Sequence, residues 1–268
     1  MSGDGTRLAH GMPDADYRAA PGLSQSALKT ILDCPARYLW ELENPRVKDA
    51  YDFGHAVHAM VLGVGPQVER LDFPGRRTND YKTAEREARA TGAVPLLASK
   101  YDEARACADA IAQHPLAGPI FAAPGESEVA MFWTDPARGV ECKGLADRVV
   151  QTGDGAHWIV DLKTTARSAA PGSFARDVAQ FGYHVQAAFY SDGYEQITGV
   201  RPWFLNVVVE SAAPYLVSVV QLDQEALDAG RVKYGDALDL HAACVASGDW
   251  PGYTEITAAT LSLPKWAR

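Results

Sequence analysis

The stretch VDLKTT at residues 160–165 places an acid and a lysine two residues apart at the end of an apolar run. The surrounding segment HWIVDLKTT (157–165) has the composition of a β-strand. On a strand, Asp161 and Lys163 share one face, while Leu162 points into the core and leaves its backbone carbonyl near the carboxylate. Two interpretations stay open at this point, because such a pair is either a salt bridge at a strand end or a costly functional group.

A second acid, Asp147, lies fourteen residues before Asp161 in GLADRVV (144–150), with the turn TGDGA (152–156) between them. Antiparallel pairing across this turn brings the two carboxylates together. Two neighbouring carboxylates repel each other unless a cation lies between them, and oxygen ligands suit Mg²⁺ or Mn²⁺. A nearby lysine orients a metal-bound water or stabilises negative charge on a phosphate. The pattern therefore predicts metal-assisted phosphodiester hydrolysis.

The rest of the chain alternates between helical and strand patterns. Ser24 is expected to cap a helix that carries Leu28, Ile31 and Leu32, and Pro35 to begin a second one. The order of elements predicts one α/β domain with a mixed central sheet flanked by helices. Residues 1–22 are expected to form a flexible leader, 23–268 the single domain, and 64–81 a loop. Further helices are expected over 52–63, 82–92, 99–113, 183–198 and 223–247, and strands over 128–135, 140–150, 157–165, 203–210 and 215–222.

Charge alone does not select a partner. The net charge of −9 argues against binding to nucleic acid, but seven acids against two basic residues in the stretch 223–255 account for more than half of it. Six basic residues between positions 70 and 89 outnumber the four acids there. The four cysteines are scattered without a CxxC pair, so no iron–sulfur or zinc cluster is expected. No signal sequence or apolar run of about 18 residues is present, so a cytoplasmic protein without membrane contact is expected.

Three further residues have a structural and a functional interpretation. His58 lies on the helix that follows Gly54; a lone histidine there is usually a core or capping residue, and His55 competes for any role. Gln186 and Tyr190 lie one turn apart on one helical face, which by itself is ordinary packing.

Taken together, these motifs resemble the PD-(D/E)XK nuclease superfamily. Asp147 and Asp161-x-Lys163 look like its core, and Gly54-x-x-x-His58 with Gln186-x-x-x-Tyr190 resemble its RecB-like branch. More narrowly, LSQSALKTILDCPARY, FGHAVHAMVLG, QFGYHVQAAFYSDGY and WPGY…LPKW are similar to RecE-type (exonuclease VIII-like) phage exonucleases, from about residue 23 to 268. Two departures are present, because Ala146 replaces the motif proline and Asp161 stands where other members have Glu.

The resemblance implies a Mg²⁺-dependent (or Mn²⁺-dependent) 5′→3′ exonuclease of double-stranded DNA ends that acts in phage or prophage recombination. Lys163 would be the catalytic lysine, and two metal ions would be held by His58, Asp147, Asp161 and the Leu162 carbonyl. Gln186 and Tyr190 would support the site or the DNA, and Glu128 would join through water. A single-strand annealing protein is the implied partner. The subunits are expected to form a homo-oligomeric ring whose channel is lined by Arg76, Arg77, Lys82, Arg86 and Arg89.

Two alternatives remain. The first is an iron–sulfur nuclease of the same branch, of the type used in CRISPR adaptation; Cys34 fits its first cysteine, but the C-terminal triplet is missing, since Cys244 stands there alone. The second is a non-catalytic DNA-binding member of the fold, which the complete set of two acids and a lysine disfavours. A nuclease assay with and without Mg²⁺ separates catalytic from non-catalytic members.

Overall fold

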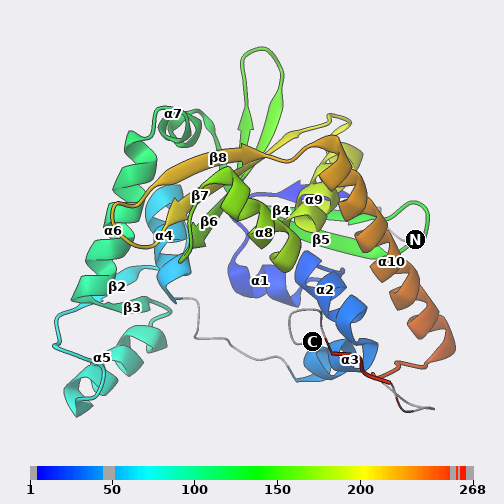
Figure 1. Cartoon of the computed structure of the whole chain (residues 1–268), viewed down its shortest axis with the longest axis horizontal. Coiled ribbons are helices and arrows are strands. Elements are labelled where there is room, and N and C mark those ends of the chain that lie inside the picture. The colour runs from blue at the N-terminus through cyan, green and yellow to red at the C-terminus, as the bar shows by residue number, and fades with distance from the viewer. Residues whose placement is uncertain (1–4, 45–51, 254–257, 259, 264–268) are drawn as a thin grey trace.

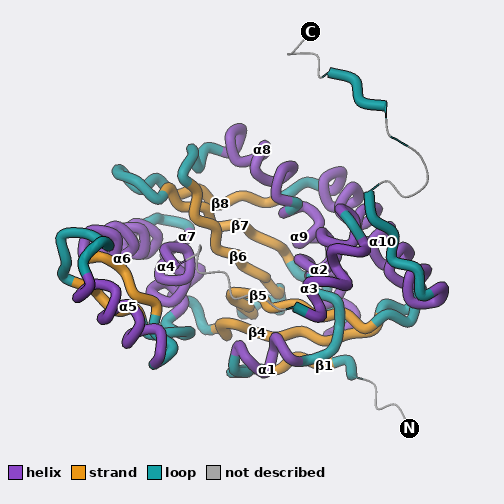
Figure 2. The backbone as a smooth tube through the Cα atoms, turned by 90° about the horizontal axis from the view of Figure 1, so that it is seen from below, coloured by secondary structure: helices purple, strands orange, loops and turns teal. Residues whose placement is uncertain are grey.

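The centre of the molecule is a six-stranded mixed sheet. The computed structural model describes residues 5–44, 52–253, 258 and 260–263. The strand order is β1-β4-β5-β6-β7-β8, with β6 and β7 parallel and the other neighbours antiparallel (Figure 2). The expected α/β class with a mixed central sheet is confirmed. The strands are β1 (Arg7–Ala9), β4 (Gly125–Thr134), β5 (Glu141–Gln151), β6 (His157–Thr165), β7 (Trp203–Glu210) and β8 (Val217–Gln221).

Helices cover both faces of this sheet, with α4 and α6 on one side and α2, α9 and α10 on the other (Figure 1). Alternation along β6 divides the two cores, because Val160 and Leu162 pack towards α4 and α6 while Asp161 and Lys163 face the opposite way. The helices are α1 (Asp14–Ala19), α2 (Gln25–Asp33), α3 (Pro35–Glu43), α4 (Asp52–Leu62), α5 (Asn79–Ala90), α6 (Ala98–Gln113), α7 (Ala117–Ala122), α8 (Pro171–Phe181), α9 (Tyr183–Thr198) and α10 (Gln224–Ser247).

Local sequence signals explain where several helices begin. The Ser24 side chain accepts a hydrogen bond from the Ala27 backbone N–H at 3.3 Å, and Pro35 occupies the first turn of α3, both as predicted. Close packing of α9 against α10 requires Gly230, because a Cβ there would lie 2.3 Å from the His184 carbonyl oxygen. The helix pair is therefore fixed at short range by a residue without a side chain.

The segment 64–81 is not simply a loop, as the sequence suggested. It contains β2 (Val68–Leu71), which pairs in parallel with β3 (Val94–Leu97) as a separate two-stranded sheet. Strands of four residues are too short to show a period, and the parallel partner lies 26 positions away from Val68 at Val94. The short helices α7 and α8 were not predicted either.

The described part of the expected flexible leader is built into the fold. Arg7–Ala9 form the edge strand β1 against β4, and Asp14–Ala19 form α1. At the other end, the Trp250 ring lies 5.7 Å from that of Tyr38 on α3. Trp266 of the closing motif lies outside the described residues. No helix within the described ranges is long and apolar enough to cross a membrane.

Candidate active site

The site forms where β5 parts from β6. The two strands pair only from Arg148 opposite Val160 to Gln151 opposite His157, so the ladder stops just before Asp147 and Asp161. At this point the Leu162 backbone N–H donates to Asp147 Oδ2 at 2.7 Å instead of to a strand. Because the N–H and C=O of one strand residue point to the same edge, the Leu162 carbonyl is directed to the same opening. Parting of the strands thus brings a carboxylate together with backbone groups of Leu162 that do not pair with β5.

Lys163 is tied to Asp161 and to α9. Its Nζ lies 2.5 Å from Asp161 Oδ2 and donates to Gln186 Oε1 at 3.1 Å. The Gln186 Nε2 in turn donates to Asp161 Oδ1 at 2.7 Å. Gln186 therefore holds both the acid and the lysine of the D-x-K motif in one orientation.

His58 reaches the site from α4. Its Nδ1 lies 3.6 Å from Asp147 Oδ2. Burial, followed by the charge of His58, lowers the pKa of the competing His55. The imidazole that faces the carboxylate is therefore that of His58.

Burial and like charge raise the pKa of Asp147. Burial raises the pKa of Asp147 and the charge of Asp161 adds to this, while His58 and Lys163 oppose it. Burial alone would lower the pKa of Lys163, but Asp161 and Asp147 outweigh burial and raise it. The lysine is thus kept charged, and two carboxylates share that one ammonium.

The donor set fits a hard divalent cation. Asp161 Oδ2 is buried, and the Lys163 ammonium lies 2.5 Å from it. Two carboxylates, an imidazole and a carbonyl are ligands that Mg²⁺ or Mn²⁺ accepts. Across the described ranges, no three His, Cys, Asp or Glu side chains are yet gathered closely enough to hold a metal. The reason is visible in the contacts, because Leu162 N–H, Gln186 and Lys163 occupy the carboxylate oxygens.

Glu128 joins the acids through a strained backbone. On β4 it stands between Ser127, paired with Arg148, and Val129, paired with Ala146, which puts it opposite Asp147. Its φ of 52° is unusual for a non-glycine residue, and such strain concentrates at functional sites. Burial raises the pKa of Glu128, and the charge of Asp147 raises it further.

The Tyr190 side chain packs against β5 at Gly144 and Leu145. The Leu145 backbone N–H donates to its hydroxyl at 3.4 Å, and burial raises its pKa to about 12. The ring requires Gly144, since a Cβ there would lie 2.9 Å from Tyr190 Cε1. The Gln186–Tyr190 pair thus holds the motif acid, the lysine and the parted strand together.

The sequence analysis missed several neighbours of the site. The Lys163 Nζ lies 4.6 Å from the ring centroid of Tyr183, the first residue of α9. Helix α1 is held by the buried Lys143, whose Nζ donates to the carbonyls of Tyr17, Arg18 and Ala20. This anchor places Asp14 where its charge acts on Glu128 and His55. No local pattern marks these residues.

The five expected channel residues lie on another part of the molecule. They belong to α5 and the segment before it, at the outer end of the side formed by α4 and α6 (Figure 1). Arg89 pairs with Asp52 of α4 at 2.7 Å, and Arg76 lines a cavity of about 360 Å³ together with Asp52, Phe53 and Lys100. Arg77, Lys82 and Arg86 have no ion-pair partner among the described residues.

Comparison with known proteins agrees with this geometry. The family described as "PDDEXK-like domain of unknown function (DUF3799)" matches residues 24–260. The chain belongs to this PD-(D/E)XK-like family. Its fold is also similar to that of a protein named "Putative exonuclease" from Eubacterium rectale, with a TM-score of 0.62 and 14% identity over 96% of each chain.

A second solved structure is much less similar. The solved structure of SSO0001 aligns with 85% of this chain and 87% of its own at 13% identity, but with a TM-score of 0.31. No curated protein matches the chain. Members of the PD-(D/E)XK fold generally use divalent metal ions, and membership of this family supports a nuclease activity.

Proposed function

We propose that the protein is a Mg²⁺-dependent 5′→3′ exonuclease that digests double-stranded DNA from its ends, in a RecE-type role that prepares single strands for annealing during phage-type recombination. The observation that carries the proposal is the pair of Asp147 and the buried Asp161, with Lys163, at the parted end of β5 and β6. The sequence resemblance supplies the polarity, the recombination role and the single-strand annealing partner.

The side chains divide the work of phosphodiester hydrolysis. Asp147, Asp161, His58 and the Leu162 carbonyl would hold one or two Mg²⁺ or Mn²⁺ ions. A bound divalent cation supplies a Lewis acid for the phosphate and a more acidic water. Lys163 stabilises the negative charge that develops on the phosphate, and its raised pKa keeps the ammonium charged at neutral pH. Gln186 keeps that ammonium and the Asp161 carboxylate in a fixed relation.

DNA binding is assigned to the basic side chains of α5 and of the segment before it. Arg77, Lys82 and Arg86 are exposed, so their charges are open to phosphates. With a net charge of −9, a single subunit would hold a polyanion weakly. A homo-oligomeric ring solves this problem because enclosed DNA cannot leave sideways, and head-to-tail contacts that close by rotation give such a ring. The solvent-facing position of the acidic α10 belongs to the same proposal.

The polarity is tested with linear duplexes that carry a label at either the 5′ or the 3′ end. The proposal predicts immediate release of the 5′ label, while 3′-labelled strands shorten gradually. Processive digestion under excess competitor DNA and a ring in solution by light scattering are also expected. Immediate release of the 3′ label would overturn the polarity, and a monomer that releases DNA after each cut would overturn the ring; neither result would remove the nuclease assignment.

A further inference from the structure

Asn206 on β7 is a buried amide without a hydrogen-bond partner in the part of the chain that the structure describes. It is the one polar residue between Trp203 and Glu210 in WFLNVVVE. The residue is fully buried, and both Oδ1 and Nδ2 lack a partner among the described residues. Buried amide groups in native proteins are nearly always paired, so an amide with both ends unpaired calls for an explanation.

The register places this amide beside the catalytic acid. Asp161 on β6 pairs with Asn206 on the parallel strand β7, so the two side chains lie on the same face of the sheet. Neighbouring strands are about 4.8 Å apart. Asp161 Oδ2 is likewise buried, and with the Lys163 ammonium 2.5 Å away it retains the capacity to accept a second hydrogen bond. The unpaired amide therefore lies next to a carboxylate oxygen that can accept one more donor.

The described surroundings of the amide are apolar on its other side. There Asn206 pairs in register with Val220 of β8, which packs with Val208, Phe174 and Val178 in the apolar cluster beneath α8. An apolar residue of similar size would suit this cluster better, because an unpaired buried amide loses its hydration without compensation. Asn206 thus weakens the local core, as residues at functional sites commonly do.

We propose that Asn206 is a positioning residue for Asp161 and acts through one buried water. A buried water typically makes about three hydrogen bonds to otherwise unpaired polar groups. Asn206 Nδ2, Asn206 Oδ1 and Asp161 Oδ2 supply that number. The water donates to the carboxylate and to the amide oxygen, and accepts from the amide nitrogen. Gln186 then fixes one oxygen of Asp161, and Lys163 together with the water fixes the other.

This role deepens the proposed nuclease function, on which it rests. A carboxylate restrained at both oxygens presents the same geometry to a cation and to Lys163 in every turnover. Groups that orient a metal-binding side chain typically change metal affinity or activity about 10- to 100-fold when they are removed. Asn206 makes no contact with substrate in this scheme, so it is not a catalytic residue.

The test compares Asn206→Leu with the wild type and with Trp158→Phe. Leucine removes the amide and keeps the number and branching of the side-chain heavy atoms. The control also removes a buried unpaired N–H, that of Trp158 Nε1, but this side chain lies on the opposite face of β6. We expect Asn206→Leu to keep or raise the melting temperature, to weaken Mn²⁺ binding in calorimetry about 10- to 100-fold, and to slow cleavage similarly. Trp158→Phe should leave Mn²⁺ affinity unchanged.

A second variant and a structure keep the outcomes separate. If Asn206→Leu does not fold, Asn206→Ser replaces it, since a hydroxyl still bonds to water and should retain most of the Mn²⁺ affinity. Unchanged Mn²⁺ affinity and cleavage in the folded leucine variant would overturn the proposal. So would a high-resolution crystal structure of the wild type without a water bonded to both Asn206 and Asp161. A wild type that shows this water but cuts no DNA would instead refute the nuclease function alone.

Discussion

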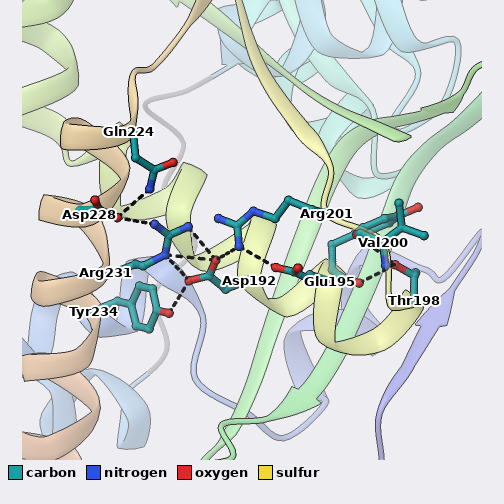
Figure 3. A network of polar contacts seen from close by, with 10 residues as sticks. Asp192, Glu195, Thr198, Val200, Arg201, Gln224, Asp228, Arg231 and Tyr234 are labelled. Atoms are coloured by element: carbon teal, nitrogen blue, oxygen red, sulfur yellow. Dashed lines mark hydrogen bonds and ion pairs between the residues drawn. The ribbon is translucent and has the colours of Figure 1, made fainter. Parts of the chain in front are cut away.

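Helix α9 carries two polar networks on different faces, and they are built in opposite ways. On the outer face, Asp192 accepts from Arg231 Nε at 2.9 Å, from Arg201 Nη1 at 2.8 Å and from the Tyr234 hydroxyl at 2.6 Å (Figure 3). On the inner face, Gln186 Nε2 donates to one oxygen of the buried Asp161 at 2.7 Å, and the Lys163 ammonium lies 2.5 Å from the other.

The difference separates a structural network from a functional one. Each oxygen of Asp192 has partners, and two guanidinium groups balance its charge. Its contacts with Arg231 connect α9 to α10. At the inner site, Asp147 and Asp161 share a single lysine, and burial raises the pKa of Asp147. A carboxylate whose charge is balanced by its neighbours stabilises the fold. Two carboxylates that share one lysine retain excess negative charge, which favours binding of a cation.

The largest effect is expected from Lys163→Ala. Removing one electrostatic group from a reacting phosphate typically lowers the rate about 10²- to 10³-fold. Single-turnover cleavage of labelled duplex should fall by this amount, while circular dichroism and DNA affinity stay close to wild type. The exposed Lys233→Ala on α10 is the matched control and should cut normally. Normal turnover by Lys163→Ala would show that this lysine takes no part in the reaction, and that the inner network is structural like the outer one.

Asp192→Asn is expected to show the reverse pattern. Hydrogen bonds to charged groups contribute more than neutral ones, but Asp192 is partly exposed, so the loss of unfolding free energy should be about 1–2 kcal/mol. Chemical denaturation measures it. Cleavage by the folded fraction should be unchanged, and a variant with full stability but impaired cutting would show that the outer network is functional.

Asp147→Asn should stabilise the protein when no divalent cation is present. Because the folded pKa of Asp147 is raised, the native state retains a proton that the unfolded state releases, and stability falls as pH rises from the ordinary Asp value through the raised one. Asparagine cannot lose that proton. The melting temperature of the variant in EDTA should therefore exceed that of the wild type increasingly from about pH 4 upward.

The cation is expected to reverse this order. Adding Mg²⁺ should raise the melting temperature of the wild type more than that of Asp147→Asn, because a ligand stabilises only the state that binds it. Equal stability of the two proteins across pH in EDTA would mean that Asp147 is not destabilised by burial and by Asp161.

The smallest effect is expected on α5. The double variant Lys82→Ala/Arg86→Ala should bind DNA more weakly, by a similar factor for all sequences. The slope of log affinity against log salt should fall by about 0.9 for each phosphate that the variant no longer neutralises. An unchanged slope would show that these two side chains do not contact DNA. The surface along which DNA reaches the inner site would then have to lie elsewhere.

The sequence predicted structure best where a local pattern, such as strand alternation or a helix cap, places the polar residues. Asp161 and Lys163 could be placed on one face because a strand alternates strictly, and Ser24 predicted its helix because capping is local. It failed where contacts are distant. The pairing of Val68 with Val94, the anchoring of α1 by Lys143 and the place of Tyr183 over Lys163 depend on folding of remote segments. The polar Asn206 within an apolar strand was a visible signal, but its register with Asp161 was not.

Metal-dependent digestion of DNA from its ends can be measured in a single assay. The purified protein is mixed with end-labelled linear duplex and with covalently closed circular duplex, each in Mg²⁺ and in EDTA. The account predicts that linear DNA is degraded in Mg²⁺ only, while closed circles survive in both. No cleavage of linear DNA in Mg²⁺, or equal cleavage in EDTA, would contradict it.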